Sequence, residues 1–178
     1  CSADWQCASG VCDEQTNMCL PYPVILDVSP WGGAQGNMVT IVGKYFGDVS
    51  GKVYFGFDVN NDTTISDNEW ILADAPTLEC PESDLWADNW AIVKVPSNDV
   101  LPLNSRSVIR IVRGDAQAYQ DTTVNERGPK AGDDGFGGYF EVTNDSYPGL
   151  CSVKTVDGGL VSAVPDTDVV ARGVGFGT

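Results

Sequence analysis

Six short runs rich in β-branched and aromatic residues recur along this chain, each followed by turn-forming residues. They lie at residues 24–28, 38–42, 51–55, 91–95, 107–112 and 139–142. Runs of this length and composition are typical of β-strands. No long segment shows the 3.6-residue spacing of apolar side chains that an amphipathic helix requires. The sequence therefore predicts an all-β sandwich, and its 178 residues leave room for a smaller unit beside it.

Four of the six cysteines, Cys1, Cys7, Cys12 and Cys19, lie in the first nineteen residues, where too few aliphatic residues are present to form a core. Such a density of cysteines predicts two disulfides. A zinc site is the competing interpretation, but the chain has no histidine and lacks Cys-x2-Cys pairs. The segment also resembles short extracellular repeats of the form Cys-x5-Cys-x4-Cys-x6-Cys.

Three pairings of these four cysteines remain open, and the short interval between Cys7 and Cys12 favours the interleaved one. Cys80 and Cys151 are left as a candidate third bridge. Disulfides form in oxidising compartments, so we expect a secreted or cell-surface protein. No run of eighteen apolar residues is present, and we expect any targeting segment to have been removed or to lie upstream.

Net charge narrows the range of partners. Ten Lys and Arg residues against 25 Asp and Glu residues give a formal charge of −15. Nucleic acid and anionic membrane surfaces are therefore poor partners, because both are themselves negative. The acidity suits either the binding of cations or a solvated, soluble surface.

A series of motifs runs in order through residues 22–143. These are Pro23-Val24-Ile25, Ser29-Pro30, Gly32-Gly33, VTIVGKYFG at 39–47, VYFG at 53–56, WAIVKVP at 90–96 and YFEV at 139–142. Together they resemble the TIG or IPT immunoglobulin-like domains of plexin-type receptors, some transcription factors and many bacterial extracellular proteins. The resemblance implies an immunoglobulin-like β-sandwich. At the corner from Gly43 to Gly47 we expect backbone torsions that a Cβ would resist, with Phe46 filling the space beneath.

Three units are expected along the chain: a disulfide-rich segment at 1–20, a TIG/IPT-like sandwich at 21–146 with an acidic insertion at 57–89, and a partial repeat at 147–178. The partial repeat is inferred because residues 169–177 (VVARGVGFG) match residues 39–47 in the order apolar run, Gly, Phe-Gly. It is either the start of a second TIG-like repeat or a strand lent to a neighbouring subunit.

The insertion contains no Lys or Arg, and its residues 58–69 (DVNNDTTISDNE) resemble the twelve-residue calcium loop of EF-hands and dockerins. In such a loop, oxygens at alternate positions converge on one hard cation, and a bidentate carboxylate closes the site from position twelve. The resemblance implies that the ligands to calcium are Asp58, Asn60, Asp62, the carbonyl of Thr64, Ser66 and Glu69.

Two features of this loop depart from the EF-hand pattern. Thr63 stands where that pattern has a sharp-turn glycine, and the preceding residues 53–57 predict a strand instead of a helix. The competing interpretation is an Asn- and Asp-rich turn that holds no metal. Asn61 and Asn144 each begin an acceptor pattern for N-glycosylation.

Catalysis is not expected. The absence of histidine removes the commonest general base and the Ser-His and Cys-His nucleophile pairs. The leading prediction is a non-catalytic structural or assembly module of an adhesin, surface layer or extracellular filament, stabilised by disulfides and calcium, whose partners are other copies of itself or neighbouring repeats. The alternative is a carbohydrate- or protein-binding module of a larger extracellular enzyme or receptor, in which Trp31, Trp70, Trp86 and Trp90 form an exposed platform.

Overall fold

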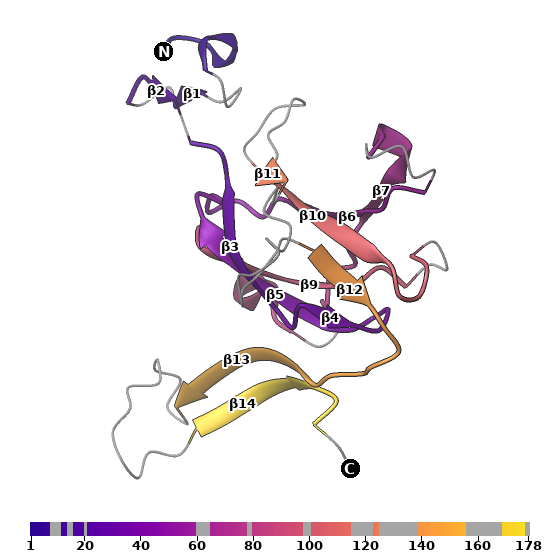
Figure 1. Ribbon diagram of the computed structural model, residues 1–178. Coiled ribbons are helices and arrows are strands. Elements are labelled where there is room, and N and C mark those ends of the chain that lie inside the picture. Colours follow the sequence, from indigo (N-terminus) through magenta and orange to yellow (C-terminus); the bar gives the residue numbers. More distant parts are fainter. Residues whose placement is uncertain are drawn as a thin grey trace.

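The computed structural model describes ten stretches of the chain: residues 1–7, 12–13, 16–19, 21–59, 65–77, 80–97, 101–114, 123–124, 139–155 and 169–176. Within them the fold is built from strands and three short 3-10 helices, η1 (Asp4–Gln6), η2 (Asp67–Glu69) and η3 (Glu82–Asp84) (Figure 1). The strands are β1 (Cys12–Asp13), β2 (Met18–Cys19), β3 (Val24–Ser29), β4 (Gly32–Gly33), β5 (Met38–Lys44), β6 (Lys52–Gly56), β7 (Trp70–Leu72), β8 (Trp86–Ala87), β9 (Trp90–Lys94), β10 (Arg106–Val112), β11 (Thr123–Val124), β12 (Tyr139–Val142), β13 (Gly149–Thr155) and β14 (Val169–Val174).

Two sheets form the sandwich. One has the order β3-β5-β9-β8, and the other has the order β4-β12-β10-β6-β7 with β11 paired to β10. In chain order, the first sheet corresponds to strands A, B, E and D of an immunoglobulin domain, while β6, β10 and β12 correspond to strands C, F and G. The chain is therefore an all-β, immunoglobulin-like sandwich with a small disulfide-bonded N-terminal segment, as expected from its strand pattern, its cysteines and the family resemblance.

Buried side chains that face the opposite sheet alternate with more exposed ones along the strands. In β10 the side chains of Ser107, Ile109 and Ile111 are buried, and those between them are more exposed. In β3 the buried residues Ile25 and Val28 are three positions apart, because the register with β5 shifts between Ile25 and Asp27. This bulge restores the inward direction for Val28.

The main core lies between the sheets and is made mostly of β-branched and aromatic side chains. Phe55 on β6 and Phe140 on β12 are fully buried and meet edge to face, with ring centroids 5.5 Å apart. The other buried members are Ile25, Val28, Val39, Ile41, Phe46, Val53, Ala91, Val93, Val95, Leu101, Ile109, Ile111 and Val142.

The acidic insertion, for which no strands were expected, adds strands to both sheets. Its β7 pairs antiparallel with β6, and its β8 pairs antiparallel with β9. Between them, Asp74 forms a bridge with Lys94, whose backbone N–H donates to the carbonyl oxygen of Asp74 at 2.8 Å. The insertion thus crosses from one sheet to the other along the open side of the sandwich.

The corner from Gly43 to Gly47 partly follows the sequence-based expectation. Phe46 is fully buried beneath it, and positive φ angles occur at Tyr45 (64°) and Gly47 (80°). Gly43 is different, because a Cβ there would overlap the carbonyl oxygen of Val24 on β3 and the ring of Phe46. Close approach of two strands, not a backbone torsion, therefore requires glycine at position 43.

Strands β13 and β14 repeat the local geometry of β3 and β5. Leu150 pairs with Gly173 before a register shift, as Ile25 pairs with Gly43 before the shift in the sandwich. A Cβ on Gly173 would overlap the carbonyl oxygen of Gly149 and lie 2.8 Å from the ring of Phe176. Gly175 has a φ of +73°, close to that of Tyr45. The sequence match between 39–47 and 169–177 is therefore also a match of backbone structure over the described residues.

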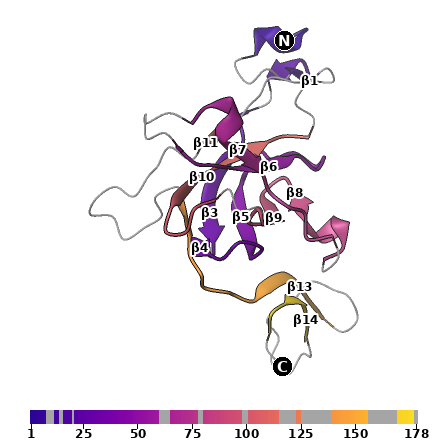
Figure 2. The same cartoon turned by 90° about the vertical axis from the view of Figure 1, so that its right-hand side faces the viewer.

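The N-terminal segment and the β13–β14 hairpin lie at opposite ends of the sandwich in both ribbon views (Figures 1 and 2). In the N-terminal segment β1 pairs with β2. None of the helices in the described stretches has the length and apolar character needed to span a membrane.

Candidate calcium-binding loop

The expected calcium loop connects two paired strands. Gly56 at the end of β6 is opposite Trp70 at the start of β7. The N–H of Phe57 donates to the carbonyl oxygen of Glu69 at 3.2 Å and closes the base of the connection. The two ends of the segment from Asp58 to Glu69 are therefore held together by the sheet, a role that helices have in an EF-hand.

Glu69 has a defined position in this loop. Its side chain is only 7% exposed. The carboxylate oxygen Oε1 accepts a hydrogen bond from the N–H of Val59 at 3.0 Å, and Oε2 accepts one from the N–H of Ser66 at 2.7 Å. The carboxylate thus links positions two and nine of the twelve-residue pattern and points into the loop.

These contacts are compatible with Glu69 as the closing ligand of a cation. An ionised carboxylate oxygen has two lone pairs, so each oxygen can accept an amide hydrogen bond and still face a metal. Asp58, at position one, and the half-buried Ser66, at position nine, belong to the described residues. Asn60, Asn61, Asp62 and Thr64 lie outside them. The same two hydrogen bonds also fit the competing interpretation, in which Glu69 ties the turn together without metal.

Trp70 places an aromatic reporter directly after Glu69. The guanidinium of Arg110 on β10 lies 3.7 Å from the centroid of the Trp70 ring. Gly56 lies beneath the same ring, and a Cβ there would be 2.5 Å from it. The ring is therefore held against the sheet at the base of the loop, where its fluorescence should respond to a cation bound by the loop.

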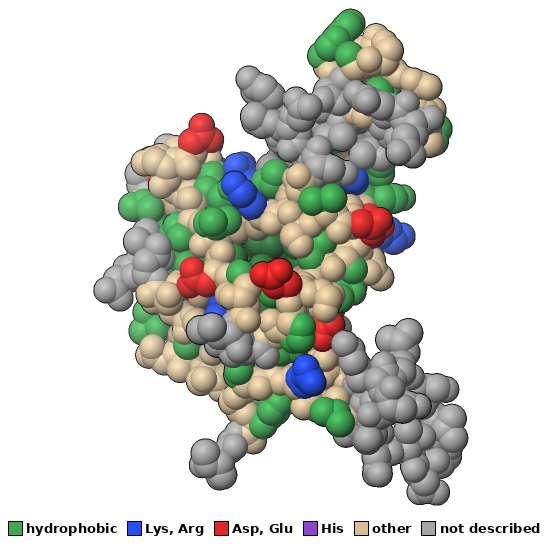
Figure 3. All heavy atoms as spheres, turned by 180° about the vertical axis from the view of Figure 1, so that it is seen from behind, with side chains coloured by type: hydrophobic (Ala, Val, Ile, Leu, Met, Phe, Trp, Pro, Cys, Tyr) green, Lys and Arg blue, Asp and Glu red, His purple; other side chains and the backbone are tan. Residues whose placement is uncertain are grey.

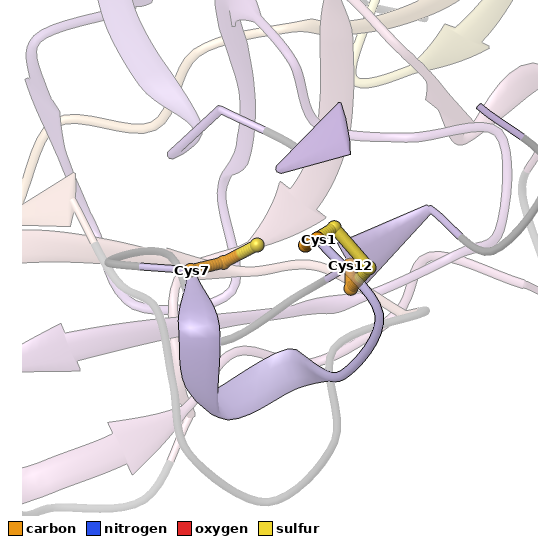
Figure 4. Close-up of side chains that lie close together, drawn as sticks. All are labelled: Cys1, Cys7 and Cys12. Carbon is orange, nitrogen blue, oxygen red and sulfur yellow. A yellow bond between two sulfur atoms is a disulfide. The ribbon is translucent and has the colours of Figure 1, made fainter. Parts of the chain in front are cut away.

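All six cysteines form disulfides: Cys1–Cys12, Cys7–Cys19 and Cys80–Cys151. The pairing in the N-terminal segment is the interleaved one. The sulfur atoms of Cys1, Cys7 and Cys12 lie within 4.8 Å of one another (Figure 4). Metals are held by thiolates, and sulfurs in disulfides offer none, so this cluster is a covalent core and not a zinc site in the oxidised chain. Three disulfides indicate an oxidising environment.

Acidic side chains on the face seen in Figure 3 lie apart from one another, among neutral, hydrophobic and some basic side chains. No dense patch of carboxylates is visible among the coloured residues there. Asn144, the second candidate glycosylation site, is described and exposed, in the segment between β12 and β13.

The tryptophans predicted to form a platform have separate surroundings. Trp31 is 61% exposed. Trp70 stacks on Arg110, the indole N–H of Trp86 donates to the carbonyl oxygen of Gly47 at 2.8 Å, and Trp90 packs on a second apolar cluster. Trp86 also lines a mainly apolar groove of about 390 Å³ at the open side of the sandwich, with Leu72, Leu85 and Val93. The described residues thus give no group of exposed indoles.

Comparison with known proteins adds little. No protein-family model and no curated protein match this chain. Among solved structures, the gamma-CGTase from alkalophilic Bacillus clarkii matches with a TM-score of 0.41 and 22% identity. The match covers 72% of this chain and only 13% of that protein. It is too weak to bear on function.

Proposed function

We propose that this chain is a non-catalytic structural and assembly module of a secreted or cell-surface protein, such as an adhesin, surface layer or extracellular filament. In this proposal its partners are neighbouring repeats or other copies of itself, and disulfides and calcium stiffen it. We also propose that the sandwich is a TIG/IPT domain, since domains of that family occur in many bacterial extracellular proteins. The observation that carries the proposal is the β13–β14 hairpin.

The hairpin has an apolar face that lacks the covering its counterpart has in the sandwich. Ile25 and Phe46 are 8% and 0% exposed, whereas the equivalent Leu150 and Phe176 are 44% and 58% exposed. Exposed apolar side chains of this size favour burial against another surface. Because the hairpin repeats strands β3 and β5, the surface that fits it is the remaining part of a similar sandwich.

The position of the hairpin is compatible with a linear array of modules. It lies at the end of the sandwich opposite the N-terminal disulfide-bonded segment (Figures 1 and 2). Consecutive modules joined in this way would contact mainly their neighbours, as in other repeat proteins. The binding-module alternative has weaker support, because the described tryptophans do not form a shared exposed surface.

Association through the hairpin is testable with Phe176→Ser. We expect the wild-type chain to show concentration-dependent association in sedimentation velocity, and Phe176→Ser to reduce it because the exposed ring is lost. Trp5→Ser is the matched control, since Trp5 is 82% exposed but lies in the N-terminal segment. A wild-type chain that stays monomeric at all concentrations would exclude association between copies and leave consecutive repeats of one chain as the partners.

Calcium is the second part of the proposal. Glu69 would close the site, with Asp58, Asn60, Asp62, Thr64 and Ser66 as the other ligands. The ion would supply positive charge to a loop that has no Lys or Arg, and it would tie the β6 and β7 ends of the insertion together. Its role would be to rigidify the loop, not to activate a substrate.

We expect saturating calcium to raise the melting temperature of the oxidised chain and to change Trp70 fluorescence. At about 100 times its dissociation constant, a ligand that binds only the folded state stabilises it by about 2.7 kcal/mol. The substitution Glu69→Gln should remove most of this shift, because it removes the closing carboxylate. Differential scanning calorimetry with calcium or a chelator is the measurement.

Asp67→Asn is the control for this experiment. Asp67 is exposed and belongs to the same loop, but position ten of the pattern supplies no side-chain ligand. Asp67→Asn should therefore preserve the calcium response, although it removes the same negative charge as Glu69→Gln. A wild-type melting temperature that is unchanged at millimolar calcium would refute the metal site and leave Glu69 as a hydrogen-bonded tie within the loop.

A further inference from the structure

The hairpin contacts the sandwich through a second apolar cluster, separate from the main core. Its buried members are Met38, Cys80, Leu85, Ile92 and Cys151, with Trp90 and Val174 packed against them. Val39 and Val93 belong to the main core, so Met38 and Ile92, each one residue away, point to the opposite face of the β5–β9 sheet. The cluster therefore covers the outer face of the sandwich.

Residues 80–85 of the acidic insertion supply one side of this cluster. The N–H of Cys80 donates to the carbonyl oxygen of Pro76 at 2.9 Å, and the N–H of Ile92 donates to that of Leu85 at 2.8 Å. The first bond closes a turn within the insertion, and the second fixes the segment against β9. Cys80 is 2% and Leu85 9% exposed, so both side chains are used in the contact.

On the hairpin, a cysteine, a glycine and a valine make the contact with this cluster. Cys151 lies in β13 where the register shifts between Leu150 and Ser152, and it is bonded to Cys80. Gly149, two residues earlier, abuts Met38, because a Cβ there would lie 2.6 Å from both Cβ and Sδ of Met38. A larger residue would push the hairpin away from the sandwich. Val174 on β14 completes the contact.

A separate anchor lies in the segment before the hairpin. The carbonyl oxygen of Asp145 accepts hydrogen bonds from the N–H of Ala34 at 2.8 Å and from Nδ2 of Asn37 at 2.9 Å. Asn37 is itself 7% exposed. Among the described strands, β13 and β14 pair only with each other, so no sheet hydrogen bonds join them to the sandwich. The hydrogen bonds to Asp145 and the Cys80–Cys151 bond add two polar or covalent anchors to the apolar contact, and together these restrict rotation of the hairpin against the sandwich.

We infer that residues 80–85 form a docking surface for the first hairpin of the following repeat, and that the Cys80–Cys151 bond locks this hairpin in one orientation. The partner that fits is a β-hairpin with cysteine at its bulge and glycine two residues before it. This part of the insertion therefore serves as a latch between repeats and not as a ligand-recognition surface. The inference rests on the proposal that β13–β14 opens a second repeat, but it requires neither calcium nor association between molecules.

Residual dipolar couplings of backbone amides test the latch. In the oxidised, monomeric wild-type chain, couplings from β13–β14 and from the sandwich should fit one alignment tensor. In the double variant Cys80→Ser/Cys151→Ser they should need two, and protection of the hairpin amides from hydrogen exchange should fall about tenfold or more. The measurement is made at low protein concentration with a calcium chelator present.

The matched control removes a different disulfide. Cys1→Ser/Cys12→Ser makes the same chemical change at the other end of the sandwich and should leave the single tensor intact for β13–β14. The inference would be overturned if the couplings of the wild-type chain already required two tensors. It would also be overturned if the couplings of Cys80→Ser/Cys151→Ser still fitted one tensor. Because the readout is intramolecular, loss of the calcium response or of association between copies does not affect it.

Discussion

Replacing Gly43 with alanine is expected to destabilise the sandwich by about 3 kcal/mol, the upper range for overpacking of a core. The added Cβ would overlap the carbonyl oxygen of Val24 and the ring of Phe46. The first is backbone held in the β3–β5 ladder, and the second belongs to a fully buried side chain. The carbonyl cannot move without opening the edge of the sheet, and the ring cannot move without disturbing the core.

Chemical denaturation of the oxidised chain measures this effect, and Gly36→Ala is its control. Gly36 has a φ of +79°, yet a Cβ there would meet nothing within 4 Å. Its substitution should therefore cost only the strain of a left-handed conformation, about 1 kcal/mol. If both variants lost equal stability, close approach at Gly43 would not be the cause.

The strands of the sandwich could be predicted because each is a run of at least four residues rich in β-branched and aromatic side chains, followed by turn-forming residues. The expected runs at 24–28, 38–42, 51–55, 91–95, 107–112 and 139–142 became β3, β5, β6, β9, β10 and β12 with small changes at the ends. Strands β7 and β8 were missed. They are three and two residues long and lie within acidic sequence, so only the Trp70-Ile71-Leu72 triplet gave a signal.

Contacts between segments distant in sequence were harder to predict. Gly43 was assigned a torsional role because its contact with Val24 depends on the pairing of β3 with β5, which no local pattern reveals. Cys80 and Cys151 were paired by elimination, but their place beside Met38 and Gly149 follows only from how the hairpin docks. For the candidate calcium loop, spacing alone identified Glu69, whereas its hydrogen bonds to Val59 and Ser66 depend on the folded loop.

The matched motifs at 39–47 and 169–177 give a second large effect, because Phe46 and Phe176 occupy equivalent positions in them with opposite burial. Phe46→Ala should destabilise the sandwich by about 3–5 kcal/mol, the usual cost of removing a buried aromatic ring. Phe46 is fully buried and packs against Trp86, with ring centroids 6.0 Å apart. Phe176→Ala should change the free energy of unfolding by less than about 0.5 kcal/mol, since its ring is largely exposed in the isolated chain.

Denaturant unfolding at low protein concentration checks both substitutions under one condition. A large loss of stability in Phe176→Ala would mean that its ring is already covered in solution, which would contradict an open hairpin face. If the two effects differ as expected, the same Gly-x-x-Phe corner exists once in a completed sandwich and once with its apolar face still open. The difference between the two substitutions then measures how much stability the second corner would gain if, as proposed, the strands of a second sandwich covered it.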